Sequence, residues 1–236
     1  MTVDSLRSIS TLTFDVFGTV LDLTGSLVPP TQKFMEDLDA EISGEDFWAQ
    51  WRARQRIEQY QDSMMMLGHS GYLETCRRAL VYCLRANDIK FSNRQVVRFM
   101  QVWQNLKPYE DSLRGLERLK GKYRLVALSN GEPWFLKHLA DNRIKFEFNR
   151  VISVEEAGFF KPHPMVYRTA ARLLDSEPSE ILMVAAHGFD IMGARASGYR
   201  GAYVNRYRLP YEDTNQYKPD MVVDDFDDLA KMLLDE

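Results

Sequence analysis

TLTFDVFGT, residues 11–19, joins a β-prone run to a carboxylate, a glycine and a hydroxyl. The residues from Thr11 to Val16 predict a buried strand, and Gly18 is typical of the turn that follows one. Asp15 then lies at a strand end. Aspartate is also common in turns for its local hydrogen bonds alone, so this position by itself leaves a structural role open.

After this strand, the pattern of apolar residues in the sequence changes twice. From about residue 31 to 104, large apolar residues recur at helical intervals, which predicts three to five helices and no strand. We expect the Pro29-Pro30 pair to break the chain before this block and Lys107-Pro108 to close it. Strands and helices then alternate, with strands expected at 124–129, 150–153, 181–186, 201–205 and 221–223.

Alternating strands and helices predict an α/β protein with a Rossmann-like, mainly parallel sheet. The first strand belongs with the second half of the chain. The helical block is therefore an insertion, and we predict a core domain from residues 1–23 and 108–236 with an α-helical cap domain at 24–107. Ligands of such sheets bind beyond the carboxyl ends of the strands, so the residues that close each strand are the candidates for a site.

Composition narrows the class of protein. The 236 residues carry a net charge of −4, which gives no indication of nucleic-acid binding. No apolar run reaches the roughly 18 residues of a membrane span, and MTVDSLRSIS lacks the apolar centre of a signal peptide. Cys76 and Cys83 have no zinc spacing and are expected to be reduced. We expect a cytoplasmic protein with no membrane and no nucleic-acid partner.

Three further strand ends carry polar groups. Ser129-Asn130 follows one strand, Lys161 precedes a proline, and His187 and Asp190 follow the apolar strand at 181–186. Each has an ordinary alternative: a helix cap, a solvated lysine and a structural histidine. Their order after Asp15 changes the interpretation. The set is also physically consistent, because a carboxylate in a partly buried site needs a nearby cation to stay ionised, and Lys161 would supply it. Thr19 and Ser129 would hold its oxygens by hydrogen bonds.

This ordered set resembles the haloacid dehalogenase superfamily over essentially the whole chain. The closer resemblance is to the L-2-haloacid dehalogenase family, through Asp15 to Thr19, Trp51-Arg52, Lys161 with Tyr167, Phe189-Asp190 with Gly193-Ala194-Arg195, and Asn205-Arg206. The resemblance implies catalytic roles for Asp15, Thr19, Lys161, His187 and Asp190. It implies substrate or halide binding by Phe17, Arg52, Ser129, Asn130, Tyr167 and Phe189. Without it, Arg52 would read as a surface residue of a charged helix and Tyr167 as a core residue.

Two departures matter. Superfamily phosphatases carry a second aspartate two residues after the nucleophile, where this chain has Phe17, and they place an early acid in the last motif to help hold Mg²⁺. A reaction without metal or other cofactor is therefore expected. The haloacid dehalogenases commonly have serine and asparagine where this chain has Ala185 and His187, which leaves open whether His187 or Asp190 activates the water.

The resemblance implies hydrolysis of short L-2-haloalkanoates to 2-hydroxyacids through an ester on Asp15, with inversion at C2. The expected partners are the 2-haloacid and water, and homodimers are common in the family. Chloro and bromo substrates are expected, with fluoroacetate open. The alternatives are a Mg²⁺-dependent phosphatase of the same superfamily, acting on a small phosphoester, and a non-catalytic relative that binds a metabolite or partner.

Overall fold

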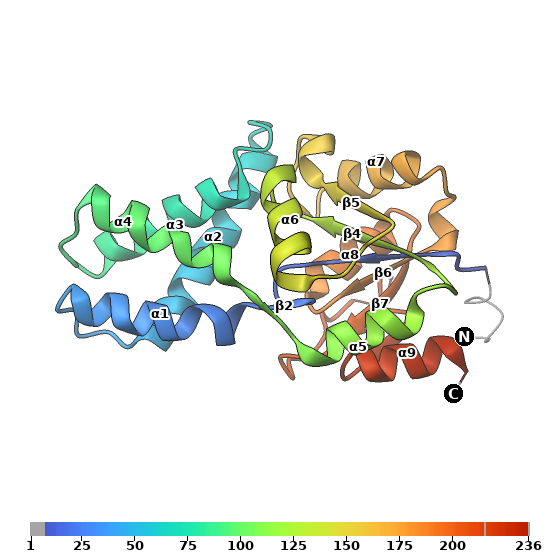
Figure 1. Ribbon diagram of the computed structural model, residues 1–236. Helices are drawn as coiled ribbons and strands as arrows, with labels where there is room; N and C mark the ends of the chain where they lie inside the picture. Colours follow the sequence, from blue (N-terminus) through green and yellow to red (C-terminus); the bar gives the residue numbers. More distant parts are fainter. Residues whose placement is uncertain (1–7, 215, 236) are drawn as a thin grey trace.

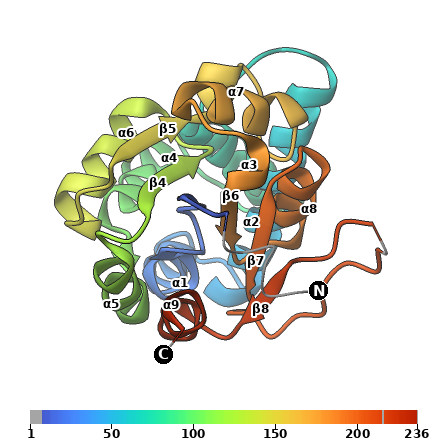
Figure 2. The same ribbon diagram turned by 90° about the vertical axis from the view of Figure 1, so that its right-hand side faces the viewer.

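A six-stranded parallel sheet forms the centre of the molecule, with strand order β5-β4-β1-β6-β7-β8 (Figures 1 and 2). The structure is a computed structural model that describes residues 8–214 and 216–235. The strands are β1 Thr11–Phe14, β4 Arg124–Ser129, β5 Arg150–Ser153, β6 Ile181–Ala185, β7 Arg200–Val204 and β8 Met221–Val223. Every one of these strands runs parallel to its neighbours, which confirms the predicted α/β class.

The first strand lies in the middle of the sheet. β1 pairs with β4 on one side and β6 on the other, with Phe14 opposite Ala127 and Val184. All four residues of β1 are buried, as expected for a parallel strand covered on both faces. Residue 15 therefore leaves the sheet at its centre, between the ends of two neighbouring strands.

Helices cover both faces of the sheet. The α5 and α9 helices pack together on one face, and α7 and α8 lie on the other (Figures 1 and 2). The helices of this part are α5 Glu110–Leu119, α6 Pro133–Leu139, α7 Pro164–Leu174, α8 Gly188–Ala196 and α9 Phe226–Leu234, with shorter helical turns η3 Ala140–Ile144, η4 Val154–Ala157 and η5 Pro178–Glu180. The α6 helix ends at Leu139, and the chain continues directly as the π-helical turn η3.

The inserted segment is helical, as predicted, and stands to one side of the sheet (Figure 1). Its elements are α1 Leu23–Asp37, α2 Gly44–Met64, α3 Tyr72–Ala86, α4 Asn93–Phe99 and η2 Met100–Asn105. A short antiparallel pair, β2 Leu21–Asp22 with β3 Lys107–Pro108, joins the points where the chain leaves the core and returns. These connections lie next to the boundaries predicted at 23/24 and 107/108.

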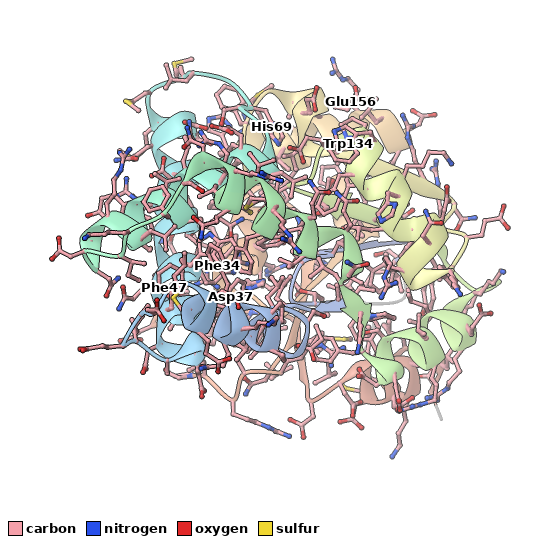
Figure 3. The ribbon with its side chains drawn as sticks, turned by 60° about the vertical axis from the view of Figure 1, so that its left-hand side comes forward. Phe34, Asp37, Phe47, His69, Trp134 and Glu156 are labelled. Carbon is pink, nitrogen blue, oxygen red and sulfur yellow. The ribbon has the colours of Figure 1, made fainter. Side chains whose placement is uncertain are left out.

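The prediction that Pro29-Pro30 breaks the chain was wrong. Both prolines lie inside α1, which begins after Asp22, whose side chain accepts a hydrogen bond from the Gly25 amide at 2.9 Å. Each proline removes one helical hydrogen bond. Tertiary packing outweighs this loss, because α1 buries Leu27 before the prolines and Phe34, labelled in Figure 3, after them. Phe34 stacks on Phe99 with ring centroids 4.1 Å apart.

Hydrogen bonds tie the helical segment to the sheet. His69, labelled in Figure 3, lies in the α2–α3 loop. It bonds the Asn130 carbonyl oxygen through Nε2 at 2.8 Å and lies against the Phe160 ring. The Leu73 amide donates to the Glu132 carboxylate at 3.1 Å. These contacts hold the α2–α3 loop and the start of α3 against the segment that follows β4. Among the residues described, no helix combines the length and the apolar character needed to cross a bilayer.

The contact between α5 and α9 provides a test of packing in the core. A Cβ atom on Gly115 would lie 2.6 Å from the Phe226 backbone oxygen, so Gly115→Ala must push the two helices apart. We expect the free energy of unfolding to fall by about 1–2 kcal/mol, despite the higher helix propensity of alanine. Urea denaturation measures this. The control is Glu117→Ala on the exposed face of the same helix, and equal stabilities for the two variants would contradict the packing argument.

Candidate active site

The predicted site residues meet at the carboxyl edge of the central strands. Asp15 follows β1, Ser129 ends β4, and His187 follows β6, and these three strands are neighbours in the sheet. Lys161 enters from the segment between β5 and α7. Topology alone thus brings together side chains that lie up to 172 residues apart in sequence.

Asp15 is 7% exposed and accepts hydrogen bonds from two sides. The Thr19 hydroxyl donates to its Oδ2 at 2.7 Å, and His187 Nδ1 lies 3.3 Å from the same oxygen. Lys161 Nζ lies 3.4 Å from Oδ1. Burial by itself raises the pKa of Asp15, but the Lys161 charge and the donors His187 and Thr19 outweigh burial and hold it well below its usual value. Asp15 is therefore ionised throughout the physiological range.

The Lys161 side chain is buried between two carboxylates. Its Nζ donates to Asp190 Oδ2 at 2.7 Å and to the Leu128 carbonyl at 2.6 Å, in addition to its contact with Asp15. A buried ammonium needs such partners to remain charged. The solvated-lysine alternative is excluded by the 1% exposure of this side chain.

Asp190 is held by Lys161 and by Tyr167, whose hydroxyl donates to Asp190 Oδ1 at 2.7 Å. Burial raises the pKa of Asp190 to about 6; the Lys161 charge opposes this shift and the Asp15 charge adds to it. Tyr167 is fully buried, so it is both a core residue and a partner of the site. Gly193 makes room for it, since a Cβ there would lie 2.7 Å from the tyrosine ring.

His187 is 7% exposed and lies between Asp15 and an open cavity. Burial lowers the pKa of His187 to about 4, against the opposing effect of the Asp15 carboxylate, so the ring is neutral at pH 7. An ionised carboxylate only accepts hydrogen bonds, which assigns the ring proton to Nδ1 and leaves Nε2 as the acceptor. His187 is thus suited to accept a proton.

Ser129 does not hold the Asp15 carboxylate, contrary to the expectation from the sequence. Its hydroxyl is fully buried and has no hydrogen-bond partner among the described residues, so it is available to a ligand. Asn130 is partly engaged: its Oδ1 accepts from the Lys161 amide at 2.9 Å, and its Nδ2 donates to Gln59 at 3.2 Å. One N–H of this amide remains for a further acceptor.

Phe17 occupies the position where a second aspartate would be needed for phosphatase chemistry. It is buried and stacks on Tyr72, with ring centroids 4.0 Å apart and an angle of 6° between the planes. In the part of the chain that is described, no group of three or more His, Cys, Asp or Glu side chains is arranged to hold a metal ion. The oxygens of Asp15 accept hydrogen bonds from Thr19 and His187 and lie beside the Lys161 ammonium, whose positive charge opposes a divalent cation there.

A cavity of about 230 Å³ lies in front of His187. Arg52 lines it from α2, with its Nη1 bonded to Gln55 at 2.5 Å, and Phe189 lines it from α8. Arg52 is therefore not merely a solvated residue on the surface of a charged helix. The remaining wall comes from the following residues: Leu23, Thr24, Trp48, Arg56, Ala186, Gly188, Tyr203, Tyr207, Leu209, Pro210 and Glu212.

Sequence reasoning missed three residues of this site. The Tyr207 hydroxyl donates to the Gly18 carbonyl at 3.1 Å, and a Cβ on Gly18, which has φ +87°, would lie 2.5 Å from it. Tyr72 and Arg56 come from the helical segment. The i,i+4 spacing of Arg56 after Arg52 was a usable signal, because such residues share one helix face. No local pattern marks the two tyrosines.

Comparison with known proteins places this geometry in a family. The family model described as haloacid dehalogenase-like hydrolase matches residues 9–198. The chain belongs to the haloacid dehalogenase-like hydrolase family. An (S)-2-haloacid dehalogenase of Xanthobacter autotrophicus is 31% identical over 84% of this chain and 76% of its own length. This confirms the resemblance inferred from the sequence.

Two further relatives align with nearly the whole of this chain. The haloacetate dehalogenase H-2 of Moraxella sp. (strain B) is 26% identical, over 97% of this chain and 99% of its own. The structure of an L-2-haloacid dehalogenase from Xanthobacter autotrophicus with chloropropionic acid covalently bound has a TM-score of 0.83 and 26% identity. It covers 96% of this chain and 98% of that one.

The Lys161 contacts predict a pH-dependent stability. Lys161→Met leaves two buried carboxylates without a cation, which raises the pKa of both above their unfolded values. A group with a raised folded pKa stabilises the protein at low pH and loses that contribution as pH rises. We therefore expect the free energy of unfolding to fall by about 3–5 kcal/mol at pH 8 and by clearly less at pH 5. Urea denaturation at both pH values measures this.

The control is Lys33→Met, which removes a lysine whose side chain is 76% exposed. We expect it to change stability by less than about 0.5 kcal/mol at either pH. A deficit in Lys161→Met that is the same at pH 5 and pH 8 would mean that charge is not what this lysine contributes.

Proposed function

We propose that this protein hydrolyses short L-2-haloalkanoates to 2-hydroxyacids through a covalent ester on Asp15. The observation that carries the proposal is a buried carboxylate kept ionised by Lys161 and in contact with His187, which lines a cavity together with Arg52. Relatives named haloacetate and (S)-2-haloacid dehalogenases support this substrate class. The relative with covalently bound chloropropionic acid supports a covalent intermediate.

In the first step, an oxygen of Asp15 forms a bond to C2 of the substrate as the carbon–halogen bond breaks. The electron pair of that bond leaves with the halide. In-line displacement inverts the stereocentre, which gives a D-2-hydroxyacid from an L-2-haloacid. The low pKa of Asp15 keeps the attacking carboxylate ionised, and Thr19 fixes its orientation through Oδ2.

The leaving halide needs donors that are in place before charge develops on it. Arg52 supplies a cation at the cavity, Asn130 has one unengaged N–H, and Phe189 offers the positive edge of its ring. The buried and unpartnered Ser129 hydroxyl is a suitable donor to the substrate carboxylate. Phe17 contributes an apolar wall beside the nucleophile.

In the second step, water attacks the carbonyl carbon of the Asp15 ester. The neutral His187 ring, whose Nδ1 lies 3.3 Å from Asp15, accepts the water proton, and the Lys161–Asp190 ion pair stays in place beside it. The tetrahedral intermediate then releases the hydroxyacid, which takes a proton and carries an oxygen that belonged to Asp15. The carboxylate is regenerated with one oxygen from water.

The two alternatives from the sequence are not favoured. Phosphatase chemistry requires a metal, and the Asp15 oxygens face donors and the Lys161 ammonium instead of further carboxylates. A non-catalytic binding protein has no need for a buried carboxylate whose pKa is lowered by a dedicated lysine. Both cysteines are free and buried, which fits the expected cytoplasmic location.

Isotope labelling tests the ester. In one turnover of L-2-chloropropionate by excess enzyme in ¹⁸O water, we expect the label in the Asp15 carboxylate and not in the product, because water attacks the carbonyl carbon. Mass spectrometry of the product and of the peptide containing Asp15 measures this.

The control is the same reaction with EDTA, which should leave halide release unchanged. Label in the hydroxyacid during that first turnover would mean that water attacks the substrate directly and that Asp15 is not the nucleophile. A tenfold loss of activity on chelation, restored by Mg²⁺, would contradict the cofactor-independent mechanism.

His187→Ala tests the second step. Alanine removes the basic nitrogen, while Thr19 and Lys161 still hold Asp15, so we expect ester formation to continue and its hydrolysis to slow by about 10²-fold or more. The intact protein would then gain the mass of the substrate less halide, visible after rapid acid quenching. His138→Ala, outside the site, is the control. Slow halide release in the burst phase, without accumulated ester, would assign His187 to positioning of Asp15 instead.

A further inference from the structure

The cavity in front of His187 contains a second arginine that the proposed reaction does not use. Arg56 lies on α2 one turn after Arg52, and both line the cavity. The halide needs one cation, which Arg52 supplies in the mechanism above. The role of the second guanidinium is therefore open.

Arg56 differs from the other arginines around it on the helical segment. Arg54 pairs with Glu58 at 2.6 Å, and Arg78 pairs with Asp62 at 2.8 Å. Arg56 has no salt bridge within residues 8–214 and 216–235, and its Nε is buried without a hydrogen-bond partner there. Its guanidinium lies over the Phe189 ring, whose centroid is 5.7 Å from the guanidinium carbon. The Arg56 side chain is half-buried, and a ligand in the cavity would supply the acceptor that its Nε lacks.

The charges around the cavity favour an anion with more than one negative group. Arg52 and Arg56 are like charges at i,i+4, which repel each other in the absence of a ligand. His187 is neutral at pH 7, and the carboxylate of the lining is that of Glu212. One carboxylate against two guanidinium groups leaves a net positive cavity in front of the nucleophile.

We propose that Arg56 determines substrate specificity by binding a second carboxylate, on the side chain of the substrate beyond C2. The preferred substrates are then 2-halodicarboxylates, not 2-haloalkanoates of the same carbon number. This rests on the proposed dehalogenase function and names its substrate class. Two guanidinium groups one turn apart on the same helix face bind two groups of one small molecule: Arg52 the halogen and Arg56 the distal carboxylate.

The test compares 2-chlorosuccinate with 2-chlorobutyrate, which have four carbons each and differ in the distal carboxylate. We expect wild-type kcat/KM to be at least tenfold higher for chlorosuccinate. Arg56→Met keeps length and apolar contact but removes the charge, and should lower kcat/KM for chlorosuccinate at least tenfold. Arg56→Lys should retain part of the preference. Arg94→Leu, which removes an exposed arginine of α4, is the charge-matched control and should leave both substrates unaffected.

Calorimetric binding of succinate and butyrate tests the Arg56 proposal independently of the dehalogenation reaction, because neither compound carries a halogen. Succinate should bind wild type more tightly than butyrate does, and Arg56→Met should lose that difference. If no chloroacid releases halide but succinate binding depends on Arg56, the dehalogenase function is wrong and the second anion position stands. If 2-chlorobutyrate is dehalogenated but neither chlorosuccinate turnover nor succinate binding depends on Arg56, the proposal is overturned and the function stands.

Discussion

The buried Lys161 ammonium is the constraint on which the rest of the site depends. Two carboxylates, Asp15 and Asp190, lie within 3.4 Å and 2.7 Å of it, and neither could stay ionised at this depth without a cation. Its third bond goes to the carbonyl of Leu128, one residue before the end of β4. Lys161 can make all three contacts only if the residues after β1, β4 and β6 lie at the same edge of the sheet. The strand order places them there, because β1 lies between β4 and β6.

This charge arrangement links the two steps of the proposed reaction. Ester formation removes the negative charge of Asp15, and that charge is one of the causes that raise the pKa of Asp190. Once Asp15 is esterified, Lys161 has a single carboxylate partner, and Asp190 is held more firmly in its ionised form. The first step thus sets the protonation state in which the second begins, without any movement of the chain.

The sequence predicted what is local and periodic. Strand ends after Phe14, Ser129 and Ala185 were predictable within one or two residues, because buried parallel strands are continuous apolar runs. The prediction of a break at Pro29-Pro30 failed because tertiary packing of α1 outweighs the cost of proline. The Ser129 hydroxyl, which has no partner among the described residues, and the contacts of Tyr207 and Tyr72 depend on which distant elements meet, and no spacing in one sequence encodes that.

The helical segment helps to explain why this chain has Ala185 and His187 where haloacid dehalogenases commonly have serine and asparagine. Ala185 is fully buried and offers no polar side chain, so the positioning of water falls to His187. After burial, the charges of Arg52 and Arg56 are further causes that lower the pKa of this histidine, and both arginines come from α2. A protonated imidazole facing two guanidinium groups would be unfavourable. The arginines that serve the substrate therefore also keep His187 neutral, so the inserted helices help to maintain the base of the second step.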